Sequence, residues 1–287
     1  MKIAFLIQCH KNPRQINRLI KALQHPSVEI FIHIDSKAKG IRECIVCDSD
    51  IHILPADQCV SVFWGQFSQV QATLNMLKYA SKCNKFDFYF LISGQDYPLK
   101  PIEYIVQYLS EGKQYDYIDS HDIPHFKKRN EIYYPLYFIG QSTYKKIMKT
   151  MYEYCTGGKN HTFSLFKRKI PNNIQAYFGS QWWCLNAETV SWLLHYLSEN
   201  PGYMVFYKHS LCPDESFFHT LVMASPYGQY VRPFLHYLQF DIGKNSPKTL
   251  KVENLESLLS SDKLMARKFD IDVDEEVLRR IEQGWKN

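Results

Sequence analysis

The sequence predicts an α/β fold in which a mostly parallel central sheet is flanked by helices. Short apolar runs and helical patterns alternate in the first third of the chain, in the order strand, helix, strand, strand, helix, strand. This order is typical of an α/β domain. Polar clusters follow three of the predicted strands, QCHKNP, HIDSK and SGQDYP. Ligands of parallel sheets bind beyond the carboxyl ends of the strands, so the clusters indicate a site.

The first half of the chain divides clearly into elements. Apolar, β-rich runs predict strands at 2–7, 28–35, 51–55 and 86–93. A helix is expected from Pro13, because proline is favoured at the first helical position. A second helix is expected over 66–82, where apolar residues recur at helical spacing. The residues GQDYP (94–98) have the composition of a turn.

The second half is less regular. Helical patterns are found at 141–155, 187–200, 250–261 and 273–284. GSQWWCLN (179–186) predicts a turn that leads into a strand, and TGGKNHTF (156–163) predicts a flexible loop. With no internal repeat and no long linker, one domain over 1–287 is expected.

Charge and composition narrow the function. The net charge of +5 over 287 residues is low for a nucleic-acid binder, so no nucleic-acid partner is expected. The basic clusters 125–130, 166–169 and 266–268 could meet an anionic substrate or a membrane surface. For the first two, a solvated face is the favoured interpretation. The twenty tyrosines suit walls that bind sugars, although half-buried packing explains most single cases.

The sequence predicts a cytoplasmic location. No stretch approaches the roughly 18 consecutive apolar residues of a membrane span, and the N-terminal apolar run is too short for a signal peptide. The eight cysteines are scattered, as in proteins whose thiols stay reduced. CIVC (44–47) has metal-site spacing but lacks a second pair, so it predicts no metal site.

The stretch CPDESFFHTL (212–221) carries the strongest catalytic signal. Pro213 suits a first helical turn, which would place Glu215 near a helix N-terminus that favours an ionised carboxylate. The following phenylalanines exclude water, and an ionised but desolvated carboxylate is a suitable general base. Asp214 is an equal candidate, and both acids could serve only to start a helix.

Several stretches, in order, resemble the core-2/I-branching β-1,6-N-acetylglucosaminyltransferases and peptide O-xylosyltransferases, one glycosyltransferase family. The resemblance covers roughly residues 3–270 and is weakest over 120–175. The stretches that carry it are IAFLIQCHKNPRQINRLIKAL, FIHIDSK, VFWGQFSQVQATL, FYFLISGQDYPLK, GSQWWCLN, PDESFFHTL and MARKFD.

The resemblance implies a GT-A type fold and an inverting sugar transfer from a UDP-sugar to a hydroxyl group. Residues 1–119 would form the nucleotide-binding half, and residues 120–287 the acceptor and catalytic half. Glu215 would be the base. The donor-binding residues that the resemblance implies are His10, Arg14 and Asp35 for the uridine and Arg267 and Lys268 for the diphosphate. Further substrate-binding candidates within the matching stretches are Asp96, Trp182, Trp183 and Asp214.

No metal and no cofactor are expected. The family that the chain resembles uses Arg and Lys at the leaving diphosphate, where negative charge develops. After the fourth predicted strand the chain has Gly94-Gln95-Asp96 instead of Asp-x-Asp. DSD (48–50) and the acids of 270–274 do match the Asp-x-Asp pattern. We expect no metal at either, because DSD precedes a strand and the acids of 270–274 open a helix, where acids are common.

The animal relatives carry a membrane anchor and disulfides, and neither feature is in evidence in this sequence, so we expect a bacterial or otherwise cytosolic relative. GlcNAc or xylose would be transferred to a glycan or lipid-linked glycan in surface polysaccharide synthesis, with peripheral contact at the inner face of the membrane. Two alternatives stay open. One is a metal-dependent transferase, which activity in a chelator would distinguish. The other is a non-catalytic sugar- or nucleotide-binding domain, which UDP release would distinguish.

Overall fold

A computed structural model describes residues 1–155, 168–243 and 246–285. Its centre is a seven-stranded sheet in the order β3-β2-β1-β4-β7-β6-β8. The strands are β1 (Ile3–Cys9), β2 (Val28–Ile34), β3 (Ile51–Ile53), β4 (Phe88–Ser93), β6 (Asp116–Tyr117), β7 (Trp183–Asn186) and β8 (Val231–Arg232). The predicted α/β class with a mostly parallel sheet is confirmed.

The first four strands form a continuous parallel part of the sheet, and β6 and β8 pair in parallel at its other end. In the register of β1, Ile3 lies opposite both Val28 of β2 and Phe88 of β4. Nearly all side chains of these strands are buried, as expected for strands covered on both faces. Strand β7 enters antiparallel between β4 and β6, so the second half of the chain completes the sheet.

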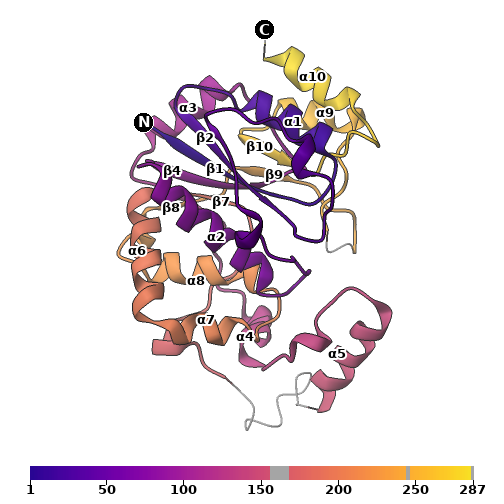
Figure 1. The fold of residues 1–287 in the computed structure, drawn as a ribbon. Helices are drawn as coiled ribbons and strands as arrows, with labels where there is room; N and C mark the ends of the chain where they lie inside the picture. The colour runs from indigo at the N-terminus through magenta and orange to yellow at the C-terminus, as the bar shows by residue number, and fades with distance from the viewer. Residues whose placement is uncertain (156–167, 244–245, 286–287) are drawn as a thin grey trace.

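Helices cover both faces of the sheet (Figure 1). Phe5 of β1 packs into one hydrophobic core with α1, α3 and α10, and Leu6 packs into the other core with α2, α6 and α8. This alternation follows from the two-residue period of a strand. The helices are α1 (Pro13–Ala22), α2 (Ser68–Cys83), α3 (Ile102–Glu111), α4 (Lys128–Glu131), α5 (Thr143–Cys155), α6 (Ala187–Glu199), α7 (Pro201–Tyr207), α8 (Phe217–Ala224), α9 (Leu255–Leu259) and α10 (Glu276–Gly284).

A second sheet corrects one prediction. GQDYP does not form only a turn, because Asp96–Pro98 is strand β5, which pairs antiparallel with β10 (Met265–Arg267). Strand β9 (His236–Leu238) lies parallel on the other side of β10. The partner of β5 is far away in the sequence, so local composition could not indicate the pairing. The small sheet brings the C-terminal ARKF stretch to the end of β4.

The other predicted elements are found within a few residues of their expected bounds. The exception is the PDES stretch, where Pro213–Glu215 forms one 3-10 turn and α8 begins only at Phe217. Ser216, with φ of −144°, separates the two, so the expectation of Glu215 in the first turn of a helix was wrong. The predicted loop at 156–163 lies outside the described residues. Within the described ranges, no helix has the length and apolarity needed to cross a membrane.

Candidate functional site

The carboxyl ends of β1 and β2 bring His10 and Asp35 together. The N–H of Asp35 donates to the carbonyl of Cys9 at 2.9 Å. Its carboxylate accepts from the Lys37 N–H at 2.9 Å and lies 3.1 Å from Lys37 Nζ. Burial, then Lys11, lowers the pKa of the imidazole of His10, and the charges of Asp35 and Lys268 also act on it. Three of the predicted donor-binding residues, His10, Asp35 and Lys268, are therefore neighbours.

The last residue of β10, Arg267, forms a buried ion pair with Asp96 of β5. Arg267 Nη1 lies 2.8 Å from Asp96 Oδ1 and 2.7 Å from Ser93 Oγ. Burial opposes ionisation of Asp96, but Arg267 and the hydrogen bonds from Ser93 hold its pKa below the ordinary value. His236 Nε2 lies 3.4 Å from the same carboxylate, without the alignment of a hydrogen bond. This arrangement fixes Arg267, at the end of the central strand of the small sheet, against Ser93 at the end of β4.

Lys268 is the more available cation of the two predicted at the diphosphate. Its side chain is half-buried, and its pKa is lowered first by burial and then by Arg267 and Lys11. Lys11 pairs with Asp270 at 2.6 Å, whereas among the described residues Lys268 forms no ion pair. Lys268 thus presents a positive charge close to His10.

The segment 179–182 connects this cation site with the PDES stretch. Gly179 N–H donates to the carbonyl of Glu215 at 3.0 Å, and the Trp182 ring lies 4.3 Å from the Arg267 guanidinium carbon. Since consecutive Cα atoms are 3.8 Å apart, Gly179 and Trp182 are separated by at most about 11 Å. A Cβ at position 179 would lie 1.6 Å from the Asp119 carbonyl oxygen, so only glycine fits there.

His219 of α8 holds the segment 179–182 in place through a hydrogen bond. Its ring is buried, and burial lowers its pKa to about 4, so it is neutral at physiological pH. In this state its Nε2–H donates to the carbonyl of Ser180 at 2.8 Å. The histidine of the PDESFFH stretch therefore positions the backbone that links Glu215 to Trp182.

Asp214 and Glu215 lie in contrasting surroundings. Asp214 is buried, and its Oδ1 has no hydrogen-bond partner among the described residues. Burial, followed by the charge of Glu215, raises the pKa of Asp214 to about 8. Glu215 is 39% exposed and forms an ion pair and hydrogen bond with Nη1 of Arg129. Burial thus favours the protonated form of Asp214, whereas Glu215 is the accessible carboxylate.

Helix α4 carries Arg129 and is bound to the PDES stretch at two further points. Asn130 Nδ2 donates to Ser216 Oγ at 2.9 Å, and the Leu211 N–H donates to the carbonyl of Arg129 at 2.9 Å. The Arg129 guanidinium also stacks on Phe126, 3.8 Å from the ring centre. The favoured interpretation of 125–130 as a solvated face was therefore wrong for Arg129, because its partner Glu215 lies far away in the sequence.

Glutamine side chains form a second connection across the site. Gly65 N–H donates to Gln69 Oε1 at 3.0 Å, and Gln69 Nε2 donates to Gln181 Oε1 at 3.1 Å. Gln181 Nε2 then donates to Gln8 Oε1 at 3.2 Å. Gly65 in turn accepts from the Cys212 N–H, directly before the PDES stretch. The chain of amides joins the end of β1 to the loop that holds Glu215.

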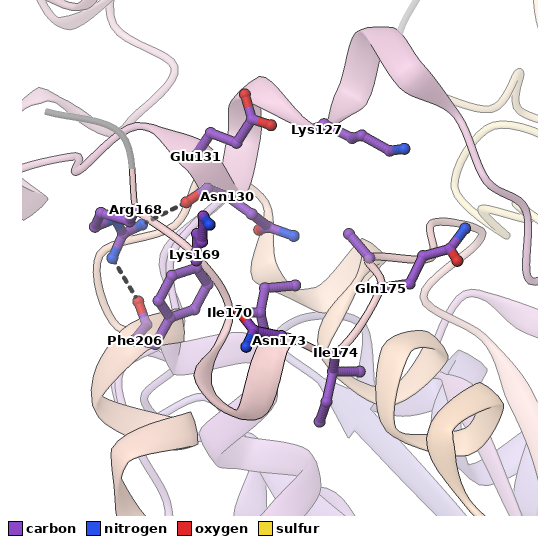
Figure 2. Close-up of a pocket in the computed structure, with 11 residues that line it drawn as sticks. Lys127, Asn130, Glu131, Arg168, Lys169, Ile170, Asn173, Ile174, Gln175 and Phe206 are labelled. Carbon is purple, nitrogen blue, oxygen red and sulfur yellow. Dashed lines mark hydrogen bonds between the residues drawn. The ribbon is translucent and has the colours of Figure 1, made fainter. Parts of the chain in front are cut away.

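A cavity of about 250 Å³ lies beside α4 (Figure 2). Its lining combines cations and amides with apolar side chains, and the amide of Asn130 faces it. The Oδ1 of Asn130 has no partner among the described residues. The lining residues are Lys127, Asn130, Glu131, Arg168, Lys169, Ile170, Asn173, Ile174, Gln175, Ala176 and Phe206.

Other predicted site residues are engaged elsewhere. Arg14 forms an exposed ion pair with Glu275 beside α10, away from His10 and Asp35. Trp183 is fully buried in the hydrophobic core and packs on Phe218, since neighbouring strand residues point to opposite faces. Asp270 binds Lys11. Over the described ranges, no three His, Cys, Asp or Glu side chains gather where they could hold a metal ion.

Sequence reasoning did not identify Arg129, His219 or Arg168 as parts of the site. The only signal for His219 was its position four residues after Glu215, on the same side of a helical pattern. Arg129 and Arg168 lie in basic clusters, and nothing local separates a paired arginine from its solvated neighbours.

The geometry so far defines a mixed α/β protein with a candidate ligand site beyond the strand ends. A family model described as Core-2/I-Branching enzyme matches residues 3–259. The chain belongs to this family of glycosyltransferases, and the predicted resemblance is confirmed.

Curated relatives are xylosyltransferases. The chain is 26% identical to xylosyltransferase oxt of Drosophila melanogaster over 99% of this chain and 33% of that protein. It is 27% identical to xylosyltransferase 2 of Rattus norvegicus over 79% of this chain and 25% of that protein. The chain therefore spans about a third or less of the length of these relatives.

Solved structures resemble the chain more distantly. One is the 4-diphosphocytidyl-2C-methyl-D-erythritol synthase of Anaerococcus prevotii, with a TM-score of 0.40, 11% identity, and coverage of 90% of this chain and 95% of that one. Another is the apo form of mouse xyloside xylosyltransferase 1, with a TM-score of 0.38, 9% identity, and coverage of 92% and 96%.

Proposed function

We propose that the chain is an inverting glycosyltransferase in which Glu215 is the general base. The observation that carries this proposal is the contrast within the acid pair. Asp214 is buried, which raises its pKa and favours its protonated form, whereas Glu215 is accessible and oriented by Arg129. A base oriented by a third group is the usual arrangement for activating a hydroxyl nucleophile.

In the proposed reaction, the Glu215 carboxylate accepts the proton of the acceptor hydroxyl. The hydroxyl oxygen attacks the anomeric carbon from the face opposite the nucleotide, and the bond from that carbon to the diphosphate oxygen breaks. UDP leaves with the bonding electrons, and the anomeric configuration inverts. Negative charge grows on the diphosphate, where Lys268 stabilises it.

Arg267 has a supporting role in this proposal. Its Nη1 is held by Asp96 and Ser93, so it orients the end of β10 and adds to the positive potential around Lys268. His10 and Asp35 are proposed to contact the uridine, because both lie at the strand ends beside Lys268. We propose that no metal is required, since these cations supply the charge that a divalent ion would supply.

The donor is proposed to be UDP-xylose or UDP-GlcNAc, and the acceptor a glycan or lipid-linked glycan hydroxyl. The relatives named xylosyltransferases and the family name support these two sugars. The cavity beside α4 would receive part of the acceptor, because its wall residue Asn130 bonds Ser216 next to the base. We also propose that the enzyme acts in surface polysaccharide synthesis, at the inner face of the membrane.

UDP release tests the proposal directly. UDP-xylose and UDP-GlcNAc are each incubated with glycan acceptors, with and without EDTA, and the anomeric configuration of the product is determined by NMR. We expect acceptor-dependent UDP release that survives EDTA, with an inverted product. Donor binding without any acceptor-dependent release would instead support a binding domain. Activity that is lost in EDTA and restored by manganese would support the metal-dependent alternative.

A further inference from the structure

Arg168 lies beside α4 and has no role in the reaction proposed above. Its guanidinium donates to the carbonyls of Phe206, Ile132 and His209, each at 2.9 Å. It also donates to the carbonyl of Asn130 at 3.1 Å and to Ser210 Oγ at 3.2 Å. Figure 2 shows the bonds to Asn130 and Phe206 at the wall of the cavity.

These acceptors belong to two separate segments of the chain. One segment is α4 with Ile132, and it carries Arg129. The other is 206–210, which leads directly into the PDES stretch and carries Glu215 a few residues later. Arg168 therefore joins the two segments whose relative position sets the Arg129–Glu215 ion pair. Its own N–H adds a bond of 2.8 Å to the Glu131 carbonyl.

The geometry of this position suits arginine. The contacts to Asn130, Ile132, His209 and Ser210 all go to Nη2, whose two hydrogens they share, whereas Nη1 reaches Phe206 and Nε has no partner among the described residues. A lysine ammonium has its three donors on one atom and does not offer two nitrogens in one rigid plane. The plane of Arg168 also lies 4.3 Å from the ring centre of Phe206, and an ammonium group would stack less well there. Burial lowers the pKa of Arg168 to about 10, so the side chain still carries its charge at neutral pH.

We propose that Arg168 is a positioning residue that acts on catalysis through Arg129. By fixing α4 against residues 206–210, it keeps the Arg129 guanidinium on the Glu215 carboxylate and so keeps that carboxylate aimed at the acceptor hydroxyl. The proposal rests on the function proposed above. It assigns no substrate contact to Arg168.

A double-mutant cycle tests the route through Arg129. We expect Arg168→Lys to lower kcat about tenfold, because small displacements of a catalytic group have large effects on rate. The dissociation constant for the UDP-sugar should not change, since the donor residues lie on other elements. In an Arg129→Gln background, the same Arg168→Lys change should alter kcat by no more than about twofold.

A purely structural role predicts a different result. Arg168→Lys would then lower kcat by the same factor in both backgrounds, and this outcome would overturn the proposal. Arg232→Lys is the matched control, because Arg232 also stacks on an aromatic ring, Tyr115 at 4.1 Å, but lies on β8. If Arg168→Lys does not fold, Ser210→Ala replaces it in the cycle, since it removes one acceptor of the Arg168 guanidinium on the segment 206–210.

Hydrogen exchange separates this proposal from the function on which it rests. The Leu211 N–H, bonded to the Arg129 carbonyl, should exchange faster in Arg168→Lys and unchanged in Arg232→Lys. Exchange could be faster in Arg168→Lys while the wild type shows no transferase activity. The proposed function would then be wrong, although Arg168 would still hold α4 against residues 206–210. Unchanged exchange together with normal wild-type transfer would overturn the positioning role alone.

Discussion

The molecule contains two Arg–carboxylate pairs near the candidate site, and they differ in burial. In the Arg267–Asp96 pair the side chains are 13% and 0% exposed, and both come from strands of the small sheet. In the Arg129–Glu215 pair they are 24% and 39% exposed, and they come from a short helix and a 3-10 turn. The first pair is enclosed by the fold, whereas the second is partly exposed to solvent.

This difference indicates what each pair contributes. A buried pair is costly to break, because removing one partner leaves an uncompensated charge. An accessible pair contributes little to stability but can exchange partners with a substrate. We therefore expect changes in the first pair to appear in the free energy of unfolding and changes in the second to appear in the rate of transfer.

The largest expected effect is on stability. Arg267→Ala leaves Asp96 buried without its cation and should lower the free energy of unfolding by about 3–5 kcal/mol. Arg14→Ala is the matched control, because Arg14 forms an exposed pair with Glu275 that is worth at most about 1 kcal/mol. Urea unfolding at pH 7 measures both. Equal losses in the two variants would mean that burial does not distinguish these pairs.

The second prediction concerns the accessible pair. Glu215→Gln should lower the transfer rate about a hundredfold or more, since it removes the general base. Donor affinity and urea unfolding should stay near the wild-type values, because the side chain is partly exposed. Steady-state kinetics and calorimetry measure these effects, with the exposed Glu256→Gln as control. Normal turnover in folded Glu215→Gln would refute the assignment of the base.

The third prediction concerns Asp214, an acid that belongs to neither of the two Arg–carboxylate pairs. The raised pKa of Asp214, about 8 against an ordinary 3.8, means that the folded state holds a proton that the unfolded state has lost. The contribution of Asp214 to stability is therefore full below pH 4 and declines as pH rises toward 8. The decline is up to about 1.4 kcal/mol per pH unit. Asp214→Asn has no such proton to lose.

Unfolding curves at pH 5, 6, 7 and 8 test this directly. Asp214→Asn should become progressively more stable than the wild type as pH rises through this range. Parallel stability profiles for the two proteins would show that Asp214 is ionised in the folded state, and Glu215 would lose its distinction as the only charged member of the acid pair.

The smallest expected effect concerns the unpaired cation. Lys268→Ala should weaken UDP binding about tenfold, the value of one charge-assisted hydrogen bond. The loss in kcat/KM for the donor should be larger than the loss in affinity, because charge grows on the diphosphate in the transition state. Titration with UDP and initial rates give the two numbers. Unchanged affinity and rate would mean that Lys268 is only part of a solvated turn.

The sequence was sufficient for the parts of the fold that local pattern determines. The strands at 3–9, 28–34 and 88–93 are mostly apolar because both faces are buried, so their positions could be predicted. Strand β5 was missed, because its pairing depends on β10 near the other end of the chain. Local composition does not contain that information.

In the candidate site, too, local sequence indicates some features, whereas others depend on residues far away in the sequence. The sequence named Glu215 and Asp214 as equal candidates for the base, and only the structure separates them, since burial of one acid and exposure of its neighbour depend on the surrounding elements. Arg129 was assigned to a solvated face for a similar reason. A basic cluster does not indicate which of its members meets a distant carboxylate.

The chain of glutamine amides from Gly65 to Gln8 has a fixed direction. The backbone N–H of Gly65 can only donate, so each amide must present its oxygen toward Gly65 and its nitrogen toward the end of β1. A glutamate at position 69 or 181 would set two oxygens against each other. The hydrogen bonds within the protein therefore explain glutamine at both positions, and no contact with a substrate is needed to explain it.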